Sequence, residues 1–120
     1  MKLRIKGDSL RLRLTRGEVE RLASAGALSE SMHLSGASFS YALRSDADAR
    51  DISAELIAAS LTVVLPEMLM QSWADSEQVS LRGQDGPLQI LVEKDFACLQ
   101  PRAGEDDSDA FPHPDQAMNE

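Results

Sequence analysis

The sequence of 120 residues has one cysteine, few aromatic side chains and no long apolar run. A single cysteine forms no disulfide within the chain, which excludes a small disulfide-stabilised scaffold. Aromatic residues make up 4% of the chain, which argues against a stacking surface for single-stranded nucleic acid. No apolar run approaches the roughly 18 residues of a membrane-spanning helix, and the N-terminus lacks the apolar region of a secretory signal. We therefore expect a cytoplasmic protein without a membrane-spanning segment.

Charge is unevenly distributed along the chain. Acidic residues outnumber basic ones by 20 to 12, which gives a formal net charge of -8 and argues against general nucleic-acid binding. Residues 1–21 nevertheless hold seven basic and three acidic side chains, a local charge of +4, so the remaining chain carries -12. The basic character of the protein is thus concentrated at its start.

The last twenty residues differ in composition from the rest. They hold six acidic side chains against Arg102 alone, together with three prolines. A polar, acidic segment with several prolines is typical of an extended tail. We predict one domain over residues 1–99, for which the hydrophobic fraction of 42% is ordinary, and an extended acidic tail over residues 100–120.

The N-terminal residues alternate between apolar and polar side chains, which predicts two strands. Gly7-Asp8 is a two-residue turn signal, so the two strands form a hairpin. One face of this hairpin is apolar, with Leu3, Ile5, Leu10, Leu12 and Leu14. We expect that face to join the core, which leaves the opposite, basic face outside.

A short helix and two further strands follow the hairpin. Thr15 and Glu18 have the spacing of a capping box, and Gly26 is a typical helix stop. These signals predict a helix over roughly residues 16–25. Alternation predicts strands near residues 28–34 and 37–44.

The same succession of patterns occurs a second time. A shift of 51 residues aligns Leu22 with Trp73, and a shift of 49 residues continues the match in the last strand of each half. The order hairpin, cap, helix and strands recurs in full. We therefore interpret the chain as a duplicated β-β-α-β-β unit with pseudo-repeats over residues 1–49 and 50–99.

The duplicated unit predicts an α+β fold with eight mainly antiparallel strands and two short helices. A closed barrel or a strongly curved sheet is favoured because closure removes exposed sheet edges. Residues 50–59 alternate like a strand, although Ile52, Leu56 and Ala59 also have helical spacing. The repeat favours the strand there.

Three stretches carry a resemblance to a known family: Arg4-Ile5-Lys6-Gly7, Arg11-Leu12-Arg13-Leu14, and the end from Glu93 to Leu99 followed by Asp109-Ala110-Phe111-Pro112. With them the chain resembles a family of small bacterial proteins classed only as a domain of unknown function. The resemblance covers almost the whole chain and implies no activity. The sequence departs from the family pattern at Ala58-Ala59, where a polar turn is expected.

The expected barrel is also similar, at the level of the fold, to the triphosphate-tunnel (CYTH-type) barrels. Those begin with a strand of alternating glutamates that serves metal and phosphate. Here the matching strand reads Lys2-Leu3-Arg4-Ile5-Lys6, so the acidic metal ligands are missing. Triphosphate hydrolysis is therefore not carried over, and a shared fold is no argument for function.

The two-residue turn sets the register of the first hairpin, with Lys2 facing Arg13 and Arg4 facing Arg11. Like charges directly opposite on one sheet face repel each other. Three arrangements could offset this repulsion: screening by solvent and salt, acidic side chains from the last strand or the tail, or a bound anion. The candidate site is this basic face, comprising Lys2, Arg4, Lys6, Arg11 and Arg13. The acidic candidates of the last strand are Glu93 and Asp95.

No motif points to catalysis, and we predict no catalytic residue, no cofactor and no metal. Cys98 is interpreted as a structural cysteine at a strand end. A metal site that combined Cys98 and His113 would lack the paired spacing of a metal-binding motif.

These observations favour a small cytoplasmic binding module without catalytic activity. Its basic face would bind an acidic protein segment or a small anion, and not nucleic acid. Self-association, with the acidic tail of one copy on the hairpin of another, is one concrete form. The alternative is an enzyme or carrier for phosphorylated small molecules, with the same cations lining the interior of a barrel.

Overall fold

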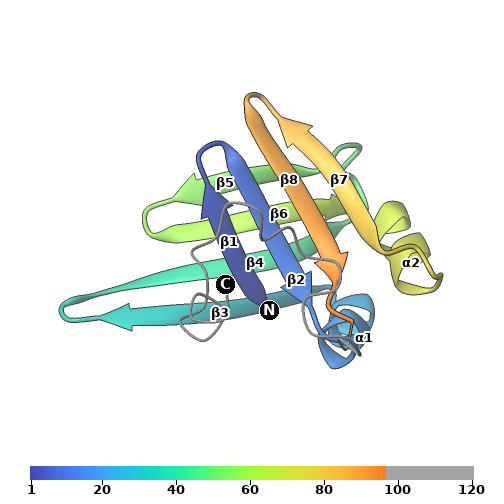
Figure 1. Cartoon of the computed structure of the whole chain (residues 1–120), viewed down its shortest axis with the longest axis horizontal. Coiled ribbons are helices and arrows are strands. Elements are labelled where there is room, and N and C mark those ends of the chain that lie inside the picture. Colours follow the sequence, from blue (N-terminus) through green and yellow to red (C-terminus); the bar gives the residue numbers. More distant parts are fainter. Residues whose placement is uncertain (97–120) are drawn as a thin grey trace, which may run out of the picture.

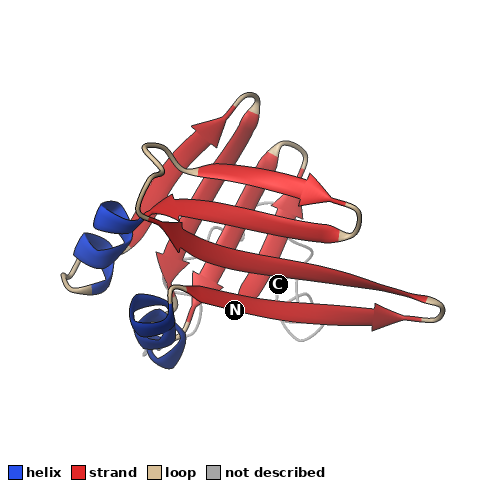
Figure 2. Cartoon of the chain, turned by 180° about the vertical axis from the view of Figure 1, so that it is seen from behind, coloured by secondary structure: helices blue, strands red, loops and turns tan. Residues whose placement is uncertain are grey.

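The computed structural model describes residues 1–96, which form eight β-strands and two short helices (Figures 1 and 2). The first half contains β1 (Lys2–Lys6), β2 (Ser9–Leu14), α1 (Arg16–Ala25), β3 (Ala27–Leu34) and β4 (Ala37–Asp46). The second half contains β5 (Ser53–Ile57), β6 (Ser60–Pro66), α2 (Glu67–Ala74), β7 (Ser80–Asp85) and β8 (Leu88–Lys94). The order β-β-α-β-β thus occurs twice, and the α+β class predicted from the sequence is confirmed.

The strands form two separate sheets of four. Sheet A has the order β1-β2-β8-β7, and sheet B has the order β3-β4-β6-β5. Each sheet combines one antiparallel hairpin from each half of the chain. The hairpins meet in the middle of each sheet through a parallel pair, β2 with β8 in sheet A and β4 with β6 in sheet B. Four of the six strand pairings are antiparallel, as expected.

The prediction of a closed barrel or one strongly curved sheet was wrong. Pairing ends at β1 and β7 in sheet A and at β3 and β5 in sheet B, so the described strands form no closed ring. The sheets instead lie face to face, and Figure 1 shows the strands of one crossing those of the other. The two parallel pairs, β2 with β8 and β4 with β6, each join hairpins within one sheet. No described strand of sheet A pairs with a strand of sheet B, so the sheets stay separate.

The core lies between the two inner sheet faces. Sheet A contributes the alternating side chains Leu10, Leu12 and Leu14, each at most 3% exposed, together with Ile90 and Val92 of β8. The prediction that the apolar face of the first hairpin joins the core is confirmed for β2. Ile5 is the exception: it lies on the edge strand β1, next to the hairpin turn, and is 60% exposed.

The two helices lie at one end of the sandwich (Figure 2). The backbone nitrogen of Glu18 donates to Thr15 Oγ1 at 3.3 Å, and the Thr15 nitrogen donates to Glu18 Oε1 at 2.9 Å, so α1 begins with the predicted capping box. Helix α1 ends at Gly26, whose φ of 82° lies in the left-handed region. Local signals alone therefore locate this helix.

Helix α2 follows Pro66 and anchors itself through one aromatic side chain. Trp73 is fully buried, and its indole nitrogen donates to the backbone oxygen of Val79 at 3.0 Å. Met70 is buried beside the same core, whereas Met68 is 86% exposed. Met70 and Trp73 therefore both belong to the core.

Residues 53–57 form strand β5, which settles the ambiguity of that segment in favour of the strand. Its hairpin turns at Ala58-Ala59, the position equivalent to Gly7-Asp8 in the first hairpin. Ala58 has a φ of 53°, close to the 55° of Gly7. The two turns thus have similar geometry at this position, and Ala58 is strained there because it is not a glycine.

The predicted domain boundary near Leu99, the acidic tail over residues 100–120, Cys98 and His113 lie outside the described residues. Within residues 1–96, neither helix has the length and apolar character needed to cross a membrane.

Candidate functional site

The candidate site is the outer face of sheet A, where side chains from all four strands form cross-strand rows. The predicted register of the first hairpin is confirmed, since Lys2 pairs with Arg13 and Arg4 with Arg11. Across the parallel pair, Arg11 lies opposite Leu91, and Leu91 in turn lies opposite Arg82 of β7. We call the set Lys2, Arg4, Lys6, Arg11, Arg13 and Arg82 the basic face.

Arg82 is the member that the sequence reasoning missed. Its alternation with Leu81 and Gly83 places it on the outer side of a strand, but sequence alone did not show that β7 belongs to the same sheet as β1. The remaining row runs from Lys6 through Ser9, Gln89 and Gln84 and adds no acidic side chain. The basic face therefore extends across the whole sheet.

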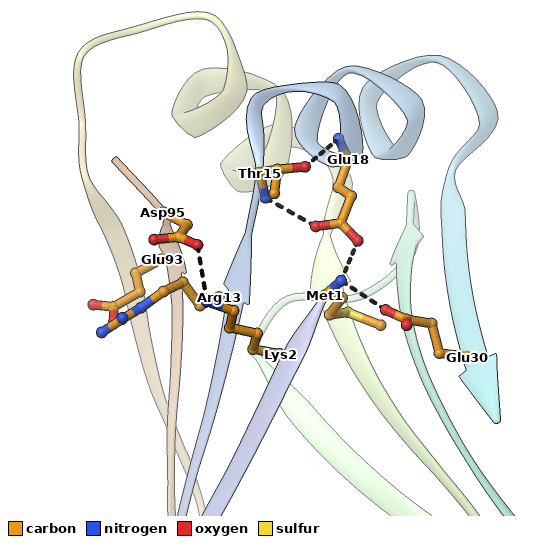
Figure 3. Close-up of polar contacts among 8 residues, drawn as sticks. All are labelled: Met1, Lys2, Arg13, Thr15, Glu18, Glu30, Glu93 and Asp95. Carbon is orange, nitrogen blue, oxygen red and sulfur yellow. Dashed lines mark hydrogen bonds and ion pairs between the residues drawn. The ribbon is translucent and has the colours of Figure 1, made fainter. Parts of the chain in front are cut away.

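Counter-charges come from the end of β8. Arg13 donates from Nε and Nη2 to Glu93 Oε1, at 3.1 and 3.0 Å, and Arg11 Nε lies 3.6 Å from the same oxygen. Lys2 Nζ lies 3.6 Å from Asp95 Oδ2, a pair drawn in Figure 3. Of the three ways to offset the repulsion, acidic side chains at the end of the last strand are thus present. Because Glu93 is only 17% exposed, its contacts with Arg11 and Arg13 are partly shielded from solvent.

The counter-charges compensate only one end of the face. Six basic side chains stand against Glu93 and Asp95, which leaves a net charge of +4 on this surface. Arg4, Lys6 and Arg82 are exposed, and no carboxylate within residues 1–96 forms an ion pair with them. The uncompensated cations thus lie toward the end of the sheet that carries the hairpin turns.

A groove of about 430 Å³ adjoins the basic face at the edge of β7. Its lining includes Arg50 and Arg82 but also Asp51 and Asp85, so its formal charges balance. Asp85 Oδ2 accepts a hydrogen bond from the Ala54 nitrogen at 3.0 Å, which ties the groove wall to β5. The groove is therefore a poorer anion site than the adjacent sheet face.

A second charged cluster surrounds the start of β1 (Figure 3). The amino group of Met1 forms ion pairs with Glu18 of α1 and with Glu30 of β3, the latter at 2.6 Å. The hydroxyl of Tyr41 donates to the Met1 backbone oxygen at 3.4 Å. The cluster fastens β1 of sheet A to α1 and to sheet B, so it has a structural role at this corner.

This cluster shifts the pKa of both partners. Burial alone would lower the pKa of the Met1 amino group, but hydrogen bonds and the negative charges of Glu18 and Glu30 raise it above its ordinary 8.0. Burial alone would raise the pKa of Glu18, but hydrogen bonds from the amino group and from Thr15 lower it below 4.5. Burial, with the charges of Glu30 and Glu18, raises the pKa of Tyr41 above 10.0.

Residues 1–96 contain no group of three histidine, cysteine, aspartate or glutamate side chains placed to hold a metal ion. His33 is exposed on β3, opposite Ser38. The other metal-ligand candidates, Cys98 and His113, fall outside the described part of the chain.

Comparison with known proteins yields a match to a family whose description names no activity. Neither the curated proteins nor the solved structures gave a match. The similarity to triphosphate-tunnel barrels therefore stays a prediction, and the two open sheets do not form the closed barrel on which it was based. A family model described as "Family of unknown function (DUF7009)" matches residues 1–115, and the chain belongs to that family.

Proposed function

We propose that this protein is a binding module that docks an extended acidic protein segment on the basic face of sheet A. The observation that carries the proposal is the cross-strand row of Arg4, Arg11 and Arg82, in which two of the three arginines have no acidic partner within residues 1–96. Arginine is suited to such a role because its planar fork binds a carboxylate through two hydrogen bonds.

The spacing of the cations favours a long ligand over a small anion. Adjacent strands lie about 4.8 Å apart, so the backbones at Arg4 and Arg82, three strands apart, are separated by about 14 Å. Lys2 and Lys6 are separated by a similar distance of about 14 Å along β1. A single phosphate reaches only part of such a surface, whereas an extended peptide with several acidic side chains covers it.

The row also contains a half-buried apolar side chain, Leu91, between Arg11 and Arg82. A ligand that lies along the row meets positive charge on both sides of an apolar patch. Acidic side chains that flank an apolar one fit this pattern best, which favours a protein segment over a uniformly charged polymer such as nucleic acid.

A comparison of the arginine row of sheet A with the equivalent row of sheet B supports the proposal. We infer that the two halves derive from one β-β-α-β-β unit, because exchanging them converts the order β1-β2-β8-β7 into β5-β6-β4-β3, which is sheet B in reverse. The row of sheet B equivalent to the arginine row holds Glu55, Thr62, Ala42 and Ser29. The fold therefore does not require cations at these positions, and a binding role explains them.

The alternative was an enzyme or carrier with cations inside a barrel. It loses its geometric basis, because the basic side chains project from the outer face and no charged side chain within residues 1–96 is buried. Burying that many cations without partners would also be strongly unfavourable.

Fluorescence anisotropy with a labelled peptide tests the proposal. The probe is a peptide with the sequence of residues 101–120, compared with an unrelated peptide of equal negative charge and with inorganic phosphate as competitor. We expect full-length protein to bind an acidic peptide in a salt-sensitive manner and phosphate to compete poorly. Absence of peptide binding at low salt, or displacement by millimolar phosphate, contradicts the proposal.

A matched pair of double variants locates the binding surface. Changing Arg4 and Arg82 together to glutamine should weaken peptide binding by roughly two- to thirtyfold, since each exposed ion pair contributes about 0.2–1 kcal/mol. Arg16→Gln with Arg21→Gln on α1 changes the net charge equally and should leave affinity unchanged. An equal loss of peptide affinity in both double variants would show that net charge alone determines binding.

The source of the acidic segment is resolved by deleting residues 101–120. If the chain's own tail is the ligand, the truncated protein should bind the peptide more tightly than the full chain does. Equal affinity assigns the surface to a segment of another protein.

A further inference from the structure

The four sheet edges of the described residues differ in how well they resist pairing with another chain. An unpaired edge is a template for strand addition unless charges, short length or a covering segment protect it. β1 is protected by Lys2, Arg4 and Lys6 at every second position. β5 has five residues, and β7 is approached by Ile52 at Gly83 and carries Arg82 and Asp85.

The β3 edge has none of these protections. β3 is eight residues long, every residue from Ser29 to Leu34 is exposed, and Glu30 is its single charged side chain. It contains neither proline nor lysine. Figures 1 and 2 show the β3–β4 hairpin projecting past the strands of sheet A, so its edge can be approached without collision with that sheet.

The projecting part of this hairpin also leaves apolar side chains uncovered. Met32 and Leu34 are 52% and 54% exposed, and Met32 lies opposite the half-buried Phe39. These side chains lie on the same face of sheet B as the core residue Leu43. The apolar inner face thus continues from the core onto a segment that no other described strand covers.

A second copy of the chain fits this edge better than a charged partner does. Two β3 strands related by a twofold axis pair antiparallel, with a residue near the middle opposite its own copy. When that residue is Ser31, Met32 or His33, Glu30 faces an uncharged position, so no like charges meet. The same registers bring the apolar side chains of the two hairpins together on one face of the joined sheet.

We propose that two copies of this protein associate through their β3 edges, which joins the two B sheets into one continuous sheet of eight strands. The dimer is held by backbone hydrogen bonds and by apolar contact of Met32, Leu34 and Phe39. Because this contact involves few charges, it is independent of the acidic docking on sheet A and should depend little on salt.

Sedimentation equilibrium of the full chain tests the dimer. We expect a concentration-dependent dimer at low and at high salt, and a monomer for the double variant Met32→Lys with Leu34→Lys. The matched control is Met68→Lys with Leu69→Lys, a second exposed methionine and leucine on α2, which should remain dimeric. A monomeric wild-type chain at all concentrations, or equal dissociation of both double variants, overturns the proposal.

Cysteine cross-linking tests the register in which the two β3 strands pair. Its positive result is a covalent dimer, which a variant that merely fails to fold would not give. In a Cys98→Ser background, single cysteines replace Ser31, Met32 or His33, and one of the three should lie opposite its copy at about 4.5–5.5 Å between Cα atoms, within disulfide range. Mild oxidation should then yield a covalent dimer for at least one position and none for Met68→Cys. Failure at all three positions contradicts the paired β3 edges.

Discussion

Exchanging the two halves of the chain superimposes the strand order of one sheet on that of the other, yet the outer faces of the two sheets carry different side chains. The middle row of sheet A reads Arg4, Arg11, Leu91 and Arg82. The equivalent row of sheet B reads Glu55, Thr62, Ala42 and Ser29, and the next one along reads Ile57, Ser60, Ser40 and Ser31. The rows of sheet A are basic, whereas these two rows of sheet B hold mainly serine, threonine and alanine, with Glu55 as their one charged side chain.

This difference separates what the fold requires from what it tolerates. Inner faces of both sheets are apolar because they make the common core, for example Leu12 in sheet A and its equivalent Val63 in sheet B. Outer faces are not constrained in this way. Like charges are concentrated on the outer face of sheet A and not on that of sheet B, and this contrast is the basis on which we propose a binding role.

The two halves also differ at the corners where sheets A and B meet. Met1 precedes β1 and meets Glu30, whereas Ile52 precedes β5 and meets Gly83 at the equivalent place. One corner is closed by ion pairs and the other by a close apolar contact. The predictions below compare equivalent positions, beginning with the largest expected effect.

Gly83→Ala should destabilise the protein by about 1–3 kcal/mol, the usual cost of overpacking. A Cβ at this position would lie 2.5 Å from Cβ of Ile52. Gly17→Ala is the control, because no atom lies within 4 Å of its added Cβ, and it should be neutral or stabilising. Urea unfolding measures both, and equal stability of the two variants would contradict the close corner contact.

Glu93→Gln should destabilise the fold by about 1–2 kcal/mol, because it removes a charged acceptor that Arg11 and Arg13 share. The equivalent position on sheet B is Arg44, whose pair with Asp46 at 3.4 Å is more exposed. Arg44→Gln should therefore cost less than about 0.5 kcal/mol. Thermal unfolding compares the two, and a larger loss at Arg44 would show that Glu93 is not an important counter-charge.

Ala58→Gly should stabilise the protein by roughly 0.5–1 kcal/mol, because it relieves a positive φ at a residue with a side chain. Gly7→Ala, the reverse change at the equivalent turn, should destabilise by about 1 kcal/mol. Chemical denaturation of the two variants checks the pair. Shifts of the same sign would argue against equivalent turns.

Arg4→Glu copies the residue at the equivalent position of sheet B and should raise stability slightly, by under about 1 kcal/mol, since it replaces repulsion from Arg11 with attraction. The same change should weaken binding of an acidic peptide. Stability and affinity moving in opposite directions is the signature of a functional charge cluster. A variant that loses both would instead mark Arg4 as structural.

The Met1 corner should make stability depend on pH, and the Ile52 corner should not. The raised pKa of the Met1 amino group gives stability that is complete below 8.0 and is lost as pH rises through the folded value. The lowered pKa of Glu18 gives stability that is complete above 4.5 and is lost as pH falls through the folded value. Glu18→Gln should remove the acid limb that Glu18 causes and weaken the alkaline limb, since Glu30 still pairs with the amino group; an unchanged profile would contradict this contact.

Local signals in the sequence were sufficient for most elements. Gly7-Asp8 correctly predicted the register that places Arg4 opposite Arg11, and the Thr15–Glu18 spacing located the first helix. Such features depend on neighbours a few residues apart. The repeat, a comparison over a longer range, resolved residues 53–57 as a strand although their own pattern was ambiguous.

The arrangement of hairpins into sheets was not predictable in the same way. The parallel contact between β2 and β8 joins residues about eighty positions apart, and alternation alone does not say which hairpins become neighbours. For that reason the prediction of a closed barrel was wrong, and Arg82 was not predicted as a member of the basic face. Glu93 was named as a counter-charge from its position on the last strand, and its pairing with Arg13 depends on that same parallel contact.

An NMR titration of the full chain with an acidic peptide tests the central claim most directly, because it reports on both outer faces at once. The account predicts salt-sensitive shifts of backbone amides around Arg4, Arg11, Leu91 and Arg82, with the equivalent row around Thr62 and Ala42 unchanged. Shifts centred on sheet B, or spread equally over both sheets, would contradict it.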